Sequence, residues 1–146
     1  MKNNIIQLIF LLSFTLCFGQ QEVSWEDLSE VTFTDKYFEK YDDYFLYPTF
    51  LPTVQNLDGQ KITVKGYFLN IEFEEQKLYI LSKAPMSSCF FCGQGGPETA
   101  VELEFKENPN FRNDAIVAIT GTLKLNNNDI DHFNYILTDC KGVLVK

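Results

Sequence analysis

A pair of closely spaced cysteines is the feature of this sequence best suited to chemistry. Cys89 and Cys92 enclose two phenylalanines, and Gly93 follows at once. A turn of this kind can place both sulfurs on one side of the chain, where two thiolates suit Zn²⁺ or Cu(I). Two thiols at this spacing can also exchange with a disulfide. The spacing therefore predicts a soft-metal site or a redox dithiol.

A metal site needs more ligands than this pair supplies. Cys140, at the end of the last predicted strand, is the best third candidate. The fourth ligand is expected to be His132, the only histidine, or a carboxylate such as Glu98 or Asp139. The predicted zinc or copper(I) ligands are Cys89, Cys92, Cys140 and His132.

Two other interpretations of these cysteines stay open. A redox dithiol works best when its first cysteine lies at a helix N-terminus that lowers the thiol pKa. Here the loop leads instead through Gly95, Gly96 and Pro97 to a predicted strand. In the structural interpretation, a disulfide between positions 89 and 92, or between 92 and 140, fastens the loop to the domain and leaves one buried thiol.

Residues 1–19 have the pattern of a cleaved secretory signal peptide. Lys2 supplies the positive charge, residues 5–16 are mostly apolar, and Cys17 to Gly19 suits signal peptidase. Leu16 stands where a lipoprotein signal needs a small residue, which disfavours a lipid anchor at Cys17. We expect an exported protein, periplasmic or secreted, and not a transmembrane protein.

The charge of the chain limits its partners. The sequence has 12 Lys and Arg against 20 Asp and Glu, a net charge of −8, so it lacks the basic surface that nucleic acid or anionic lipid requires. Glu98, Glu102 and Glu104 line one side of the third predicted strand, and we expect this polar face to be solvated. The sequence contains no phosphate loop, nucleophile elbow or zinc-protease histidine pair, and we predict that the protein is not an enzyme.

Residues 20–57 form a leader rich in aromatic side chains. Ser24 and Asp27 resemble a helix N-cap pair, which predicts a short helix over residues 25–30, with a second helix over residues 35–45. The aromatic stripe is expected to pack the leader onto a barrel, with a ligand cage as the alternative.

Residues 58–146 change to short alternating segments separated by turn residues, the pattern of β-structure. The predicted strands are residues 61–73, 77–82, 99–105, 115–125 and 133–138. The apolar residues of the first strand change parity at Gly66, which indicates a bend in a strand shared by both halves of a barrel. The fourth strand, which contains Gly121, could be a second corner of this kind. We predict a mainly β fold: a small, five-stranded, OB-like antiparallel barrel with a short helical, aromatic leader.

Residues 57–67, 81–83, 88–99 and 120–123 resemble a family of small exported bacterial proteins of unknown function, the domain of unknown function of the 3299 type. The Cys-Phe-Phe-Cys-Gly segment is the specific part of this resemblance. It implies an OB-like fold, a location in the cell envelope and no established activity.

These observations predict an exported accessory or binding protein of the cell envelope. We expect a monomer whose partner is a metal ion or an unknown envelope protein. The alternatives are a periplasmic thiol-redox protein and an interaction module whose cysteines form only a structural disulfide.

Overall fold

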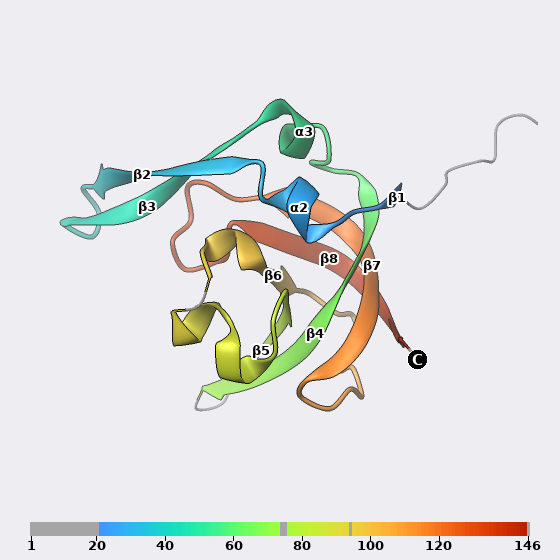
Figure 1. The fold of residues 1–146 in the computed structure, drawn as a ribbon. Helices are drawn as coiled ribbons and strands as arrows, with labels where there is room; N and C mark the ends of the chain where they lie inside the picture. The colour runs from blue at the N-terminus through green and yellow to red at the C-terminus, as the bar shows by residue number, and fades with distance from the viewer. Residues whose placement is uncertain (1–20, 74–75, 94, 146) are drawn as a thin grey trace, which may run out of the picture.

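The structure is a computed structural model that describes residues 21–73, 76–93 and 95–145. The predicted signal peptide lies outside the described residues. The main body is a closed five-stranded β-barrel (Figure 1), and this confirms the mainly β prediction. Its strands are β4 (Lys61–Phe73), β5 (Gln76–Ser82), β6 (Ala100–Leu103), β7 (Ala115–Leu125) and β8 (Tyr135–Leu144).

The barrel closes because its longest strand has two partners. The strands are ordered β4-β5-β6-β8-β7, and β4 pairs with both β5 and β7. Four of these contacts are antiparallel, but β6 and β8 run parallel, with Glu102 opposite Ile136. The prediction was a purely antiparallel barrel, and the pair of β6 and β8 departs from it. Strand β7 lies between β6 and β8 in sequence and runs opposite to β8, so β6 and β8 run in the same direction.

The buried face of β4 changes two residues later than predicted. Ile62 and Phe68, at even-numbered positions, are both buried. The buried side then changes to odd-numbered positions at Leu69, which is also buried. Gly66 has a different role: a Cβ atom there would lie 2.6 Å from the carbonyl oxygen of Ser82. Glycine at this position lets β4 approach its neighbour at the corner of the barrel.

This change of face divides the buried side chains into two clusters. The inner cluster includes Phe68, Leu81 and Cys140, and the second consists of Leu69, Ile80, Cys89 and Ala100. Since successive side chains of a strand point to opposite faces, Leu69 and Ile80 belong to the outer face of the sheet. Cys89 and Cys140 therefore pack on opposite sides of the barrel wall.

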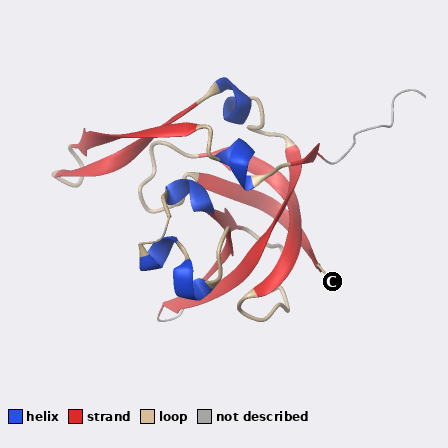
Figure 2. Cartoon of the chain, viewed as in Figure 1, coloured by secondary structure: helices blue, strands red, loops and turns tan. Residues whose placement is uncertain are grey.

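The leader contains one of the two predicted helices. Helix α2 (Trp25–Leu28) begins with a capping box between Ser24 and Asp27, as predicted. The helix predicted over residues 35–45 is wrong, because these residues belong to an antiparallel hairpin of β2 (Val31–Phe38) and β3 (Asp43–Phe50) (Figure 2). The hairpin is stabilised by cross-strand aromatic pairs such as Tyr37 and Tyr44, whose ring centroids lie 5.2 Å apart.

The leader is attached to the barrel by strand pairing and hydrogen bonds. Strand β1 (Gln21–Glu22) adds in parallel to β4, and the short helix α3 (Pro52–Gln55) leads from the hairpin to the barrel. Tyr135 donates a hydrogen bond of 2.6 Å to the carbonyl oxygen of Leu28, and the Trp25 indole donates one of 2.7 Å to that of Lys65. Within the described ranges, no helix has the length and apolar character needed to cross a membrane.

Candidate functional site

The cysteine pair lies in the segment that joins β5 to β6. This segment contains three short 3₁₀ helices: η2 (Met86–Ser88), η3 (Phe90–Cys92) and η4 (Pro97–Thr99). Cys89 stands between the first two of them. Gly93 ends η3 with a φ of 73°, a left-handed conformation that glycine adopts without strain. The glycine after the second cysteine therefore serves to end the turn.

The two thiols converge on a single acceptor. The Sγ atoms of Cys89 and Cys92 each donate to the carbonyl oxygen of Met86 at 3.2 Å. Cys89 is buried, with 3% of its surface exposed, whereas Cys92 is exposed. Both are free thiols, as is Cys140. The predicted convergence of the first two sulfurs is thus present.

A cavity of about 400 Å³ opens beside the two thiols. Met86, Cys89 and Cys92 all line it, so that three sulfur-containing side chains surround one space. Asn70 lines it as well, and among the described residues its Oδ1 is a buried oxygen without a hydrogen-bond partner. The rest of the lining is Ile71, Glu72 and Asn113.

Cys140 does not join this group. It packs in the inner cluster, where its Sγ donates to the carbonyl oxygen of Leu137 at 3.0 Å. Burial raises the pKa of the Cys140 thiol to about 12. The cavity that Cys140 lines also contains Lys61 and Lys106 and is separate from the cavity beside Cys89. The structure therefore does not bring the predicted third ligand to the cysteine pair.

His132 is bonded to a carboxylate instead of lying beside the thiols. Its Nδ1 lies 2.8 Å from Oε1 of Glu102, and the backbone N–H of Phe133 donates to the other oxygen of this carboxylate at 3.0 Å. The hydrogen bond to Glu102 raises the pKa of His132. Glu102 is 7% exposed, so the expectation that it is solvated is wrong: the short strand β6 is buried on both faces.

The two carboxylate candidates, Glu98 and Asp139, are not among the residues that line the cavity beside the cysteine pair. Asp139 forms an ion pair of 2.8 Å with Lys106 and lines the same cavity as Cys140. Across the part of the chain that the structure describes, no three His, Cys, Asp or Glu side chains are grouped so that they could hold a metal ion. The four-ligand site therefore stays a prediction, of which only the Cys89 and Cys92 pair is assembled here.

Met86 is the residue that the sequence analysis missed. Side chains three residues apart in a 3₁₀ helix lie on the same side, and Met86, Cys89 and Cys92 repeat at this interval. The M-x-x-C-x-x-C spacing was therefore visible in the sequence. The spacing alone does not assign Met86 to the site, because methionine is more often a core residue than a ligand.

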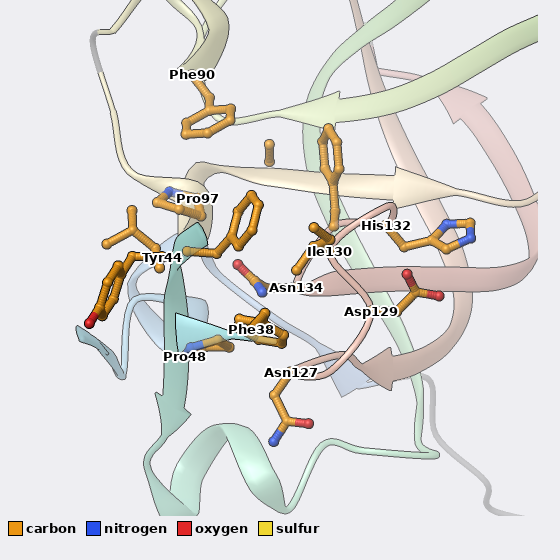
Figure 3. A pocket seen from close by; sticks show the side chains of 14 residues that line it. Phe38, Tyr44, Pro48, Phe90, Pro97, Asn127, Asp129, Ile130, His132 and Asn134 are labelled. Carbon is orange, nitrogen blue, oxygen red and sulfur yellow. The ribbon is translucent and has the colours of Figure 1, made fainter. Parts of the chain in front are cut away.

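The same segment also contributes to a second cavity, of about 430 Å³ (Figure 3). Phe90, between the two cysteines in sequence, lines this second cavity together with the β2–β3 hairpin and the loop between β7 and β8. The Cys-Phe-Phe-Cys segment thus borders both cavities.

No protein-family model matches the chain, and no curated protein matches it in sequence. Among solved structures, it is similar to the crystal structure of a DUF3299 family protein, PA4066, from Pseudomonas aeruginosa PAO1. The two share 13% sequence identity with a TM-score of 0.56, over 88% of this chain and 97% of the other. At this identity the similarity concerns the fold alone.

Proposed function

We propose that this chain is an exported accessory protein of the cell envelope that binds copper(I) through Cys89 and Cys92, with Met86 as third ligand. The observation that carries the proposal is the convergence of both thiols on the Met86 carbonyl, beside a cavity that all three sulfur side chains line. Export is supported by the signal-peptide pattern of residues 1–19.

The ligand set favours copper(I) over zinc. Zinc in proteins takes four ligands from cysteine, histidine and carboxylates. Glu72 is the one carboxylate among the residues that line the cavity with the two cysteines, and within the described ranges no three His, Cys, Asp or Glu side chains are grouped so that they could hold a metal ion. Copper(I) accepts thiolates together with a thioether. Two cysteines and a methionine therefore suit copper(I) better than zinc.

The alternative thiol-redox function is less well supported by the geometry. In such proteins an accessible first cysteine lies at the N-terminus of a helix, which lowers its pKa. Here the first cysteine, Cys89, is the buried one, and the exposed Cys92 stands at the end of a single 3₁₀ turn. The exposed thiol thus lacks the helix N-terminus that would activate it.

The test is a copper(I) titration of the reduced mature chain in competition with a chromophoric copper(I) chelator. We expect one ion per chain, loss of binding in Cys92→Ser, and about tenfold weaker binding in Met86→Leu, which conserves the side-chain volume. Cys140→Ala is the matched control, because this thiol lies in the other cluster; it should bind like the wild type. Binding that survives in Cys92→Ser, or that requires Cys140, would refute the proposal.

A further inference from the structure

The second cavity has walls from three segments that are distant in sequence. Phe38, Tyr44 and Phe45 come from the hairpin, Phe90 from the cysteine segment, and Phe133 from the loop between β7 and β8. Figure 3 shows Phe90 on one side of this space, with Tyr44 and Phe38 on others. Five of the fourteen residues that line the cavity are therefore phenylalanine or tyrosine, although the cavity lies at the surface of an acidic protein.

The aromatic walls are held in place before any ligand arrives. Phe45 packs edge-on against Phe38 at a centroid distance of 5.8 Å and against Tyr41 at 5.7 Å. The Tyr41 hydroxyl donates to Asp131 at 3.4 Å, which links the hairpin to the loop opposite. Rings fixed in this way lose little conformational freedom when a ligand enters.

The charged side chains that line the cavity already have partners. His132 is bonded to Glu102 at 2.8 Å, and the Asp129 carboxylate accepts the backbone N–H of Asp131 at 3.1 Å. A charged ligand would have to compete with these contacts. The electrostatics of the cavity therefore favour an uncharged ligand.

Asn134 supplies an uncharged acceptor. Its Nδ2 donates to the carbonyl oxygen of Asn126 at 3.1 Å, which fixes the orientation of the amide. Figure 3 shows this amide directed into the space between the rings. The Asn134 Oδ1 is thus oriented to accept a hydrogen bond from a molecule in the cavity.

We propose that this cavity binds a flat, uncharged aromatic molecule that carries one hydrogen-bond donor, of the indole or phenol class. The rings of the cavity pack against the ligand ring, and Asn134 Oδ1 accepts the donor. A volume of about 430 Å³ lies within the range of small-molecule sites and accommodates one or two fused rings. This site is distinct from the proposed copper site, and its ligand needs no metal.

The test uses two probes, 5-fluoroindole and 5-fluoro-1-methylindole, in which a methyl group replaces the N–H donor; both are titrated with the mature chain and followed by fluorine NMR. We expect saturable binding of the indole with a Kd of about 1 mM or lower. The methylated probe should bind about fivefold more weakly, because it cannot donate to Asn134. Asn134→Leu should remove the difference between the probes.

Phe45→Ala should weaken both probes, since it removes a wall of the cavity. Tyr47→Ala is the matched control, because Tyr47 is an aromatic of the same hairpin outside the cavity lining; it should leave both affinities unchanged. The comparison of the two probes on the wild-type chain needs no variant to fold. Equal affinity of the two probes, the absence of saturable binding, or full binding in Phe45→Ala would overturn the proposal.

Discussion

Replacing Tyr135 by phenylalanine should weaken the attachment of the leader to the barrel. Tyr135 is fully buried, and its hydroxyl donates to the carbonyl oxygen of Leu28, which ends helix α2. The substitution keeps the ring but leaves a buried carbonyl without its donor. Loss of the hydrogen bond together with an unsatisfied buried acceptor costs about 2 kcal/mol.

This free energy is large enough to measure by urea unfolding. With a urea dependence of about 1.5 kcal/mol per molar, a loss of about 2 kcal/mol lowers the midpoint by about 1.3 M. The single tryptophan, Trp25, lies in α2, so its fluorescence reports on the leader, while far-UV circular dichroism reports mainly on the barrel. We expect both signals to shift together if the leader and the barrel unfold as one unit.

The control for this experiment is Tyr37→Phe. The Tyr37 hydroxyl donates to Asp42 at the exposed end of the hairpin, where Tyr37 is 44% exposed. Water can replace this bond, so the midpoint should change by less than about 0.3 M. A shift for Tyr135→Phe no larger than that of the control would show that the buried hydrogen bond does not hold the leader.

Three further predictions concern single side chains. Because burial raises the pKa of Cys140 to about 12, this thiol should resist iodoacetamide at pH 8, while the exposed Cys92 is alkylated. Peptide mass spectrometry measures the labelling of each cysteine, and equal labelling of the two would contradict the prediction. The pKa of His132 is raised by Glu102, so this pair should stabilise the fold fully below about pH 6.5 and lose its contribution as the pH rises through the folded pKa. An NMR titration of the only histidine should show that pKa falling towards 6.5 in Glu102→Gln, and an unchanged value would exclude the pair as its cause. Gly66→Ala should cost about 2 kcal/mol or more in thermal or urea unfolding, because the new Cβ would lie 2.6 Å from a carbonyl oxygen of β5; a variant as stable as the wild type contradicts this.

The barrel could be predicted from the sequence because its strands carry their own signals. Strands β4 and β7 begin and end at the predicted residues, since alternating apolar side chains are bounded there by turn residues. Strand β7, which was predicted as a possible second corner, carries a register shift between Thr120 and Thr122. Local patterns of this kind need no knowledge of the partner strand.

The hairpin was missed because its aromatic residues imitate a helix. Residues 37, 38, 41, 44 and 45 follow the spacing of three and four that a helical face shows. In the structure this spacing arises from two strands and the turn between them: Tyr37 lies opposite Tyr44, and Asp42 in the turn has a φ of 53°. Only the pairing across the turn, which a linear pattern does not contain, distinguishes the two structures.

The candidate site was predictable only where its residues are close in sequence. Cys89 and Cys92 share one short segment, so their spacing alone brings them together. The position of Cys140 depends on which face of β8 it occupies, and that face is set near Gly121, where the ladder between β7 and β8 shifts its register. Since one residue of shift moves a side chain to the opposite face of a sheet, the sequence could not assign Cys140 to the inner cluster.

The geometry of the cysteine segment explains why a single short motif borders two cavities. In a 3₁₀ turn the residues at i and i+3 lie on one side, while those between them point elsewhere. Cys89 and Cys92 therefore face the cavity beside Met86, and Phe90 faces the aromatic cavity. A regular strand would have alternated these side chains between two faces and separated the thiols, because positions 89 and 92 differ in parity. The tight turn that Gly93 ends is thus what allows the cysteines to act as a pair and Phe90 to serve a different surface.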